Sequence, residues 1–291
     1  MENKEDLKHC GSPHPARWRE TIDPFSLTYH NFQLKEVIGY PHAANDVFHV
    51  AGIYEGREIT AYLKVARQEG TGIEHEANIL SQIKGDLFPK VIDIGREPRP
   101  FSVTAEMPGK RLSLIVGENK DMASLSYMEA YGEALAKFHR MNPLAPRQRE
   151  RKFYQRPTAE MLEDLGLEDL EPFFEEKPKA GQTVFCHGDF HYANVLWQEH
   201  RLSAILDLEF AGYGDRDFDI AWALFLRPEQ KFLKTDEERE SFLRGYGRHG
   251  AYDEGAVKYY MAQNYVHFLS RIKADREYGE YAYEWLKKHI S

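Results

Sequence analysis

The sequence predicts an α+β fold in which an N-terminal antiparallel sheet with one helix precedes a mainly helical C-terminal part. Three strand-like runs follow one another between residues 32 and 66, separated by short turn-forming segments. A segment with one apolar stripe at helical spacing comes next, and two further apolar runs complete the sheet pattern. In the second half of the chain, long segments repeat their apolar residues at helical spacing.

Length and composition place the chain among ordinary globular proteins. Its 291 residues suffice for one large domain or two medium ones sharing a cleft. Hydrophobic residues make up 42% and charged residues 29%, and no run approaches the roughly 18 apolar residues of a membrane span. The charged N-terminus lacks the apolar stretch of a secretion signal. We therefore expect a cytoplasmic protein with no membrane partner.

Acidic residues outnumber basic ones, 47 against 38, which gives a formal net charge of −9. Nucleic-acid binding usually requires a basic patch or stripe, so this partner is disfavoured, whereas a cationic substrate or plain solubility fits. Cys10 and Cys186 are too far apart in sequence for a paired-cysteine metal motif. We expect Cys186 to be a small buried residue.

The predicted elements begin after a polar N-terminal segment. Residues 1–28 contain three prolines and no sustained period, so we interpret them as an extension. Strands are predicted at residues 32–39, 46–54 and 57–66. The connection between the first two has a single glycine, Gly39, and cannot approach phosphate as a repeated Gly-x-Gly loop does, although backbone amides at residues 43–46 could still contact it.

Lys64 lies in the third predicted strand, on the face opposite to the apolar residues of that strand. Thr71 and Glu74 form a capping-box pattern that predicts the start of the next helix. On this helix Glu76 lies among the apolar positions and faces inward, whereas Glu74 faces solvent. Because an inward carboxylate is costly unless it is paired, we expect an ion pair between Lys64 and Glu76.

The segment 184–209 predicts a loop followed by two strands joined by a turn. This support would hold three oxygen-bearing side chains at one end, Asp189, Asn194 and Asp207. Phosphoryl transfer requires a carboxylate near the attacking hydroxyl and oxygen ligands for Mg²⁺. Asp189 suits the first role, and Asn194 with Asp207 suits the second. The alternative is that Asp189 and Asn194 cap turns.

The motifs of this segment resemble those of the aminoglycoside phosphotransferase family. The residues that carry the resemblance are His187, Gly188, Asp189, Asn194, Asp207, Leu208 and Glu209, with Gly214-Asp215 and Asp219-Ile220-Ala221 further on. The resemblance implies transfer of the γ-phosphoryl group of a nucleoside triphosphate to a hydroxyl of a small molecule, with an aminoglycoside-like antibiotic as the favoured acceptor. It assigns base catalysis to Asp189, Mg²⁺ binding to Asn194 and Asp207, and phosphate binding to Lys64 held by Glu76.

The same resemblance implies a protein-kinase-like fold with two lobes. After the extension, residues 29–107 would form a nucleotide-binding lobe with its hinge, and residues 108–291 a catalytic and acceptor-binding helical lobe. In the hinge, the backbone from Ala105 to Met107 would bind the base edge. Side chains do not decide the base there, so ATP and GTP both stay open.

The acceptor would bind in the helical lobe by the same analogy. Basic residues at 147–152 precede eight acidic residues between 160 and 176, and these would suit a polycationic acceptor. The alternative is that these acidic residues form a solvated helix face, and this explains most of them better. Further candidate contacts in the C-terminal helices are Tyr265, Asp275, Glu280 and Glu284. His139, at the end of a helix predicted to open with a Ser126–Glu129 capping box, is expected to be structural.

Three other functions compete with this prediction. Metabolite kinases acting on choline, homoserine, fructosamine or methylthioribose, and macrolide kinases, share the motif set. A protein kinase is disfavoured because Gly188 replaces its Arg and no Asp-Phe-Gly stands at Asp207. A nucleotide-binding pseudokinase would explain the glycine-poor loop, but the base, the metal ligands and Lys64 are all present.

Overall fold

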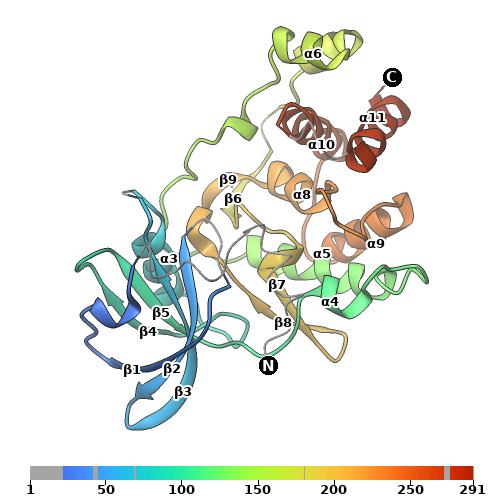
Figure 1. The fold of residues 1–291 in the computed structure, drawn as a ribbon. Helices are drawn as coiled ribbons and strands as arrows, with labels where there is room; N and C mark the ends of the chain where they lie inside the picture. The colour runs from blue at the N-terminus through green and yellow to red at the C-terminus, as the bar shows by residue number, and fades with distance from the viewer. Residues whose placement is uncertain (1–21, 42–44, 69, 180, 272–275, 291) are drawn as a thin grey trace. The chain divides into compact units, whose positions relative to one another are not determined.

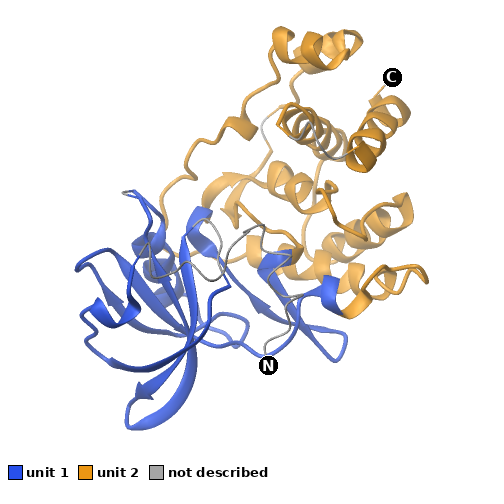
Figure 2. Ribbon diagram, in the orientation of Figure 1, with its two compact units in different colours: residues 1–114, 193–210 blue, residues 115–192, 211–291 orange. Residues whose placement is uncertain are grey.

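The computed structural model describes residues 22–41, 45–68, 70–179, 181–271 and 276–290. Most of the proposed N-terminal extension, residues 43–44 of the first connection and the candidate contact Asp275 lie outside these residues. By compactness the chain forms two units (Figure 2): unit 1 contains residues 1–114 and 193–210, and unit 2 contains residues 115–192 and 211–291. The boundary expected after Met107 remains a prediction.

Unit 1 is built on a five-stranded antiparallel sheet of order β1-β2-β3-β5-β4 (Figure 1). Its strands are β1 (Phe32–Gly39), β2 (Asp46–Tyr54), β3 (Arg57–Val65), β4 (Val91–Gly95) and β5 (Phe101–Ala105). In β3 the buried side chains of Ala61, Leu63 and Val65 alternate with more exposed ones, because successive strand residues point to opposite faces. This confirms the predicted N-terminal antiparallel sheet.

The helix α3 (Ile73–Gln82) contacts β4 and β5 and buries Ile73, Ile79 and Leu80. The predicted capping box at its start is wrong. Gly72 is the N-cap, and no side chain caps the helix. The reason is tertiary: a Cβ at Gly72 would lie 2.2 Å from Cγ of Glu209, so only glycine allows this approach.

Unit 1 also contains the hairpin of β7 (Val195–Gln198) and β8 (Arg201–Ile205), followed by a short 3₁₀ helix at Leu208–Phe210. The hairpin is bonded to earlier segments of the same unit: Lys110 and Trp197 exchange backbone hydrogen bonds of 2.9 and 2.8 Å. The amide of Ile205 donates to the carbonyl of Leu87 at 2.8 Å. The predicted hairpin is therefore present between Asn194 and Asp207 and is fixed by backbone contacts at both strands. Asp189, the third side chain that it was predicted to hold, belongs to unit 2, so its place beside the other two stays a prediction.

Unit 2 is mainly helical, as predicted, with a two-stranded sheet of β6 (Thr183–Cys186) and β9 (Gly212–Asp215). Its helices are α5 (Leu125–His139), α6 (Ala159–Leu165), α7 (Glu171–Glu175), α8 (Arg216–Leu224), α9 (Asp236–Gly247), α10 (Glu254–Leu269) and α11 (Arg276–Ile290), while α4 (Leu112–Val116) lies across the unit boundary. None of the helices in the described residues is long and apolar enough to cross a membrane.

Helices α5 and α9 pack tightly in unit 2 (Figure 1). A Cβ at Gly132 would lie 1.9 Å from the carbonyl oxygen of Phe242, and one at Gly245 would lie 1.9 Å from that of Glu129. The predicted capping box at Ser126 is wrong, because α5 begins at Leu125 and Ser126 donates its hydroxyl to Ala123 instead. A capping box does open α9, where Thr235 and Glu238 bond reciprocally.

Candidate active site

Lys64 on β3 is the centre of a charged cluster within unit 1. Its Nζ donates to Oε2 of Glu76 on α3 at 2.7 Å and to Oδ1 of Asp207 at 2.8 Å. The first contact is the ion pair expected from the sequence. The second brings a carboxylate from 143 residues further along the chain to the same ammonium group. The cluster thus joins the sheet, the helix and the segment after β8.

The charge on Lys64 is stabilised by this arrangement. Burial alone would lower the pKa of its ammonium group, but the two carboxylates raise that pKa well above the usual value. The pKa of Glu76 is raised, chiefly by burial and further by Asp207, against the opposing effect of Lys64. We conclude that Lys64 is a permanent cation at neutral pH.

The backbone around Asp207 is held in an unusual conformation. Asp207 has φ of 63°, in the left-handed region that non-glycine residues rarely adopt. The amide of Leu208 donates to Oε1 of Glu76 at 2.9 Å, and the amide of Leu206 donates to the carbonyl of Asn194 at 2.8 Å. Bonds on both sides therefore fix the conformation, as is typical where backbone strain serves a functional site.

Glu209 connects the same segment to two further parts of unit 1. Its Oε1 accepts the amide of Gly72 at 3.0 Å, at the start of α3, and its Oε2 accepts Nδ2 of Asn45 at 3.0 Å, just before β2. The sequence motif included Glu209, but sequence reasoning gave it no role. Its bonds show that it holds Asn45 and the start of α3 against the segment that carries Asp207.

The oxygen donors in unit 1 suit a hard divalent cation. Asn194 is buried and is bonded through its carbonyl to the residue before Asp207. Asp207 uses Oδ1 for Lys64, and within the described residues its Oδ2 accepts no hydrogen bond. One carboxylate and one amide side chain are the ligand types that Mg²⁺ takes in proteins. The residues present therefore fit this ion.

Asp189 belongs to unit 2 and is largely buried, with 17% of its side chain exposed. Oδ1 accepts the indole N–H of Trp222 at 2.7 Å, and Nε2 of His191 lies 3.5 Å from Oδ2. Burial raises the pKa of this carboxyl, but His191, Arg151 and Arg227 together bring it well below the usual range. Asp189 is therefore a charged acceptor of hydrogen bonds at neutral pH.

The loop before Asp189 is anchored by Asp219 on α8. The amides of His187 and Gly188 each donate to its carboxylate at 2.9 Å, and Arg151 donates to the carbonyl of Gly188 at 2.6 Å. His139 bonds Asp219 at 3.0 Å through Nε2 and Tyr246 at 2.7 Å through Nδ1. Asp219 thus anchors the loop, and His139 is structural, the latter as expected.

Buried Cys186 lies with His139 and Asp219 in a cluster whose ligand-type atoms are all within 4.8 Å of one another. Both ring nitrogens of His139 and both oxygens of Asp219 already take part in the contacts just described. Burial raises the pKa of the Cys186 thiol well above its usual value. The cluster is therefore explained by packing and loop anchoring.

The residues that the sequence suggested for binding the base or the acceptor differ in their environments. Ala105 ends β5, and its amide donates to the carbonyl of Lys90 at 2.9 Å; Met107 follows two residues later. Tyr265 is fully buried in α10, where its hydroxyl accepts the amide of Leu226 at 3.0 Å. Glu280 pairs with Arg276 at the surface, and Glu284 is exposed. Tyr265 is thus a core residue.

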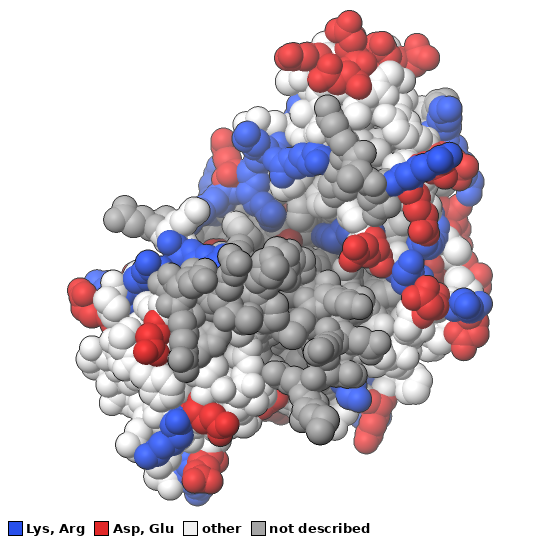
Figure 3. All heavy atoms as spheres, viewed as in Figure 1, with Lys and Arg blue, Asp and Glu red and all other residues white. Residues whose placement is uncertain are grey.

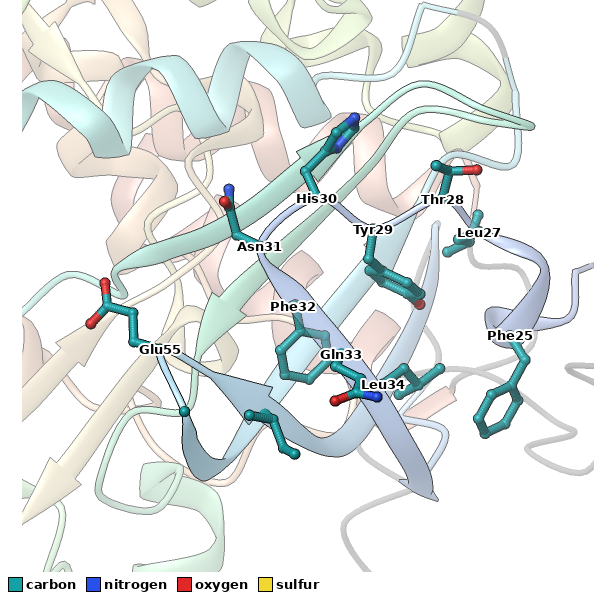
Figure 4. A pocket seen from close by; sticks show the side chains of 12 residues that line it. Phe25, Leu27, Thr28, Tyr29, His30, Asn31, Phe32, Gln33, Leu34 and Glu55 are labelled. Carbon is teal, nitrogen blue, oxygen red and sulfur yellow. The ribbon is translucent and has the colours of Figure 1, made fainter.

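An open hollow of about 750 Å³ lies elsewhere on unit 1 (Figure 4). It is lined by residues 25 and 27–34, together with residues 53, 55 and 56 at the end of β2. In Figure 4 Phe25 and Tyr29 come from the segment that leads into β1, and Phe32 is the first residue of β1. None of the candidate residues described above lines this hollow.

Sequence reasoning missed Trp222 and the two arginines near it. The guanidinium carbons of Arg151 and Arg227 lie 4.7 and 5.1 Å from the centre of the Trp222 ring. A signal for Trp222 was available: it follows Asp219 by three residues on one helix, and residues three apart share a helix face. Arg151 comes from a distant segment, and Arg227, five residues after Trp222, lies beyond the end of α8, so neither left such a signal.

The sequence and the fold have counterparts among known proteins. A family model described as "Phosphotransferase enzyme family" matches residues 41–259, well over half of the chain. An aminoglycoside 3'-phosphotransferase of Niallia circulans is 37% identical over 87 residues, 30% of this chain. This match spans 32% of the length of that curated relative. The chain therefore belongs to the phosphotransferase enzyme family.

Two solved structures share the fold. One is a ternary complex of a thermostable mutant of aminoglycoside phosphotransferase APH(4)-Ia with AMP-PNP and hygromycin B, with TM-score 0.55, 16% identity and coverage of 90% of this chain and 94% of that one. The other is choline kinase from Cryptosporidium parvum Iowa II, with TM-score 0.52, 13% identity and coverage of 99% and 94%. The expected kinase-like fold is confirmed.

Proposed function

We propose that this protein transfers the γ-phosphoryl group of ATP or GTP to a hydroxyl of a small molecule, with an aminoglycoside-like antibiotic as the favoured acceptor. The observation that carries the proposal is the Lys64 ammonium group held between Glu76 and Asp207. A permanent cation beside a strained aspartate with a further oxygen for a metal ion matches what phosphoryl transfer needs. Nucleoside triphosphates are abundant in the cytoplasm, where we propose that the protein acts.

Each residue of the unit 1 cluster has one task. Lys64 binds the nucleotide phosphates, and Glu76 keeps it in place. Asp207 and Asn194 hold Mg²⁺, which neutralises charge on the polyphosphate when bound. Glu209 holds Asn45, whose backbone amide contacts phosphate. The backbone at Ala105 to Met107 binds the base.

Asp189 acts on the acceptor. The transfer breaks the bond from the γ-phosphorus to its bridging oxygen and forms a bond from that phosphorus to the acceptor oxygen, and the hydroxyl proton passes to Asp189. Because the carboxylate is a weak base, it accepts a hydrogen bond at first and takes the proton late, once the acceptor oxygen has begun to bond phosphorus. Its main contribution is to orient the hydroxyl.

Three observations favour a polycationic acceptor. The Niallia circulans relative is an aminoglycoside 3'-phosphotransferase, and the APH(4)-Ia complex contains hygromycin B. Acidic side chains gather over α6 (Figure 3), where Glu160, Glu163 and Asp164 are all exposed. Because Arg151 and Arg227 lie near Asp189, we infer that the ammonium groups of such an acceptor lie away from the reacting hydroxyl.

The test is release of nucleoside diphosphate with Mg²⁺ and either ATP or GTP across aminoglycosides, macrolides and small amino or sugar alcohols. The Asp189→Ala protein serves as the blank, since it keeps the unit 1 cluster. Turnover with an aminoglycoside that disappears in the blank is the expected result. Turnover with choline or a sugar alcohol alone would move the protein to the metabolite kinases. Nucleotide binding without turnover of any acceptor would overturn the proposal in favour of a pseudokinase.

A further inference from the structure

We propose that Trp222 is a positioning residue, whose indole N–H holds one oxygen of the Asp189 carboxylate so that the other oxygen faces the acceptor hydroxyl. This role rests on the proposed function. The distance from Nε1 of Trp222 to Oδ1 of Asp189 is 2.7 Å, short for an N–H···O hydrogen bond and expected when the acceptor is charged. Trp222 is 3% exposed, and a buried indole N–H usually bonds a group within the protein; here that group is Asp189.

The Trp222 ring is held by groups other than Asp189. Arg227 donates to the Trp222 carbonyl at 2.8 Å, and the guanidinium carbons of Arg151 and Arg227 lie over the ring. A guanidinium group over an indole face is attracted by the ring electrons. Phe153 and Phe225 pack against the ring with centroids 5.1 and 5.2 Å away. These contacts orient the indole N–H of Trp222 independently of the Asp189 carboxylate.

One helix controls both the position and the direction of Asp189. Asp219 on α8 binds the amides of His187 and Gly188 and so fixes the backbone that leads to Asp189. Trp222, three residues later on α8, fixes the side chain. Reaction rates depend steeply on the orientation of such a group, and a group held by a rigid element is more accurately placed than one on a loop alone.

The charges around Asp189 do not depend on the indole N–H. His191 lies beside Oδ2, and the positive charges of Arg151 and Arg227 act on the carboxylate. Loss of the N–H would leave these charges in place and remove the direction that it imposes on Oδ1. We therefore expect a loss in the chemical step and no loss in nucleotide binding, whose residues belong to unit 1.

The first test compares Trp222→Phe with Trp285→Phe. The former removes the N–H but keeps an aromatic ring under Arg151 and Arg227. Trp285 on α11 is the matched control: it is 6% exposed, and within the described residues its Nε1 has no hydrogen-bond partner. Trp222→Phe should lower kcat roughly tenfold, as expected for a lost hydrogen bond to a charged group. The nucleotide KM should stay within about twofold for both variants.

Two outcomes of this comparison would overturn the proposal. One is an unchanged kcat in Trp222→Phe; the other is an equal fall in Trp285→Phe. Melting temperatures of both variants show whether either has lost its fold. If Trp222→Phe melts early, the second test still decides the question in the otherwise unchanged protein.

The second test follows the indole N–H signals of the four tryptophans by NMR, with no acceptor present. The two Phe variants assign the signals of Trp222 and Trp285 by their loss. Asp189→Asn should shift the Trp222 signal upfield and leave that of Trp285 in place. If the chemical shift of the Trp222 indole N–H were the same in Asp189→Asn as in the wild type, no such hydrogen bond would exist. A signal that responds in a protein without turnover would instead show that the proposed function fails, and the catalytic role of Trp222 with it.

Discussion

Lys64 satisfies two carboxylates that would be costly to keep close together without it. Glu76 and Asp207 each lie within hydrogen-bond distance of Nζ, at 2.7 and 2.8 Å. Removing the cation would leave two like charges facing each other, and Glu76 is buried. We therefore expect Lys64 to contribute to the stability of unit 1, in addition to its proposed role in binding phosphate.

Lys64→Met should destabilise the protein by about 2 kcal/mol, less than for a fully buried pair because 34% of the Asp207 side chain is exposed. Thermal unfolding should show a melting temperature lower by roughly 5 °C. The double variant Lys64→Met with Glu76→Gln should recover part of this loss, since one of the two charges is then gone. A single variant as stable as the wild type would show that the ammonium group does not hold the cluster together.

The Lys64–Glu76 pair could be predicted from the sequence, but its third member could not. The strand period placed Lys64 opposite the apolar face, and the helix period turned Glu76 inward. Both arguments are local. The contact of Lys64 with Asp207 depends on how distant segments of the chain pack, and so does the contact of Asp189 with Trp222. The spacing of residues in a single sequence does not reveal such packing. The sequence therefore indicated the candidate residues and the Lys64–Glu76 pair, but not the contacts between segments that are far apart in the chain.

At the scale of elements, close packing decided where helices begin. Thr71 and Ser126 each stand three residues before a Glu, yet neither caps its helix. At α3 the close approach of Glu209 requires a glycine at the N-cap, Gly72. The Thr71–Glu74 capping box therefore does not form. The capping box formed at Thr235, where both reciprocal bonds are satisfied. Local helix-start signals are thus weaker evidence than the apolar stripe of the helix itself.

The contact of α5 with α9 gives an element-scale prediction. Gly132→Ala would place a Cβ 1.9 Å from the Phe242 carbonyl oxygen, which is backbone and cannot rotate away. The helices must separate, so we expect a loss of about 3 kcal/mol despite the better helix propensity of alanine. Denaturant unfolding of the variant and the wild type measures this loss in the free energy of unfolding.

Gly279→Ala is the matched control, because in α11 an added Cβ meets no atom of the described structure within 4 Å. It should stabilise the protein by about 0.5–1 kcal/mol through helix propensity alone. If the two variants changed the free energy of unfolding equally, the close approach of α5 to α9 would not restrict the side chain at residue 132.

At the scale of the whole molecule, the proposed tasks are divided between the two compact units. Lys64, Glu76, Asn194 and Asp207 belong to unit 1, and Asp189 belongs to unit 2 (Figure 2). The unit boundary falls between Tyr192 and Ala193, within the stretch that separates Asp189 from Asn194. A motif that is continuous in sequence therefore supplies both units, and substitutions only a few residues apart should affect different steps.

Nucleotide-dependent stability tests this division. A ligand that binds only the folded protein stabilises it by about 2.7 kcal/mol at a free concentration 100 times its Kd. With Mg²⁺ and AMP-PNP, the wild type and Asp189→Ala should show the same rise in melting temperature, since the nucleotide is bound by unit 1. Asp207→Asn, or EDTA added to the wild type, should remove most of the rise, because the metal ion then has no carboxylate or is absent. A full rise in Asp207→Asn would exclude Asp207 as a metal ligand. A rise lost in Asp189→Ala would instead show that Asp189 takes part in holding the nucleotide.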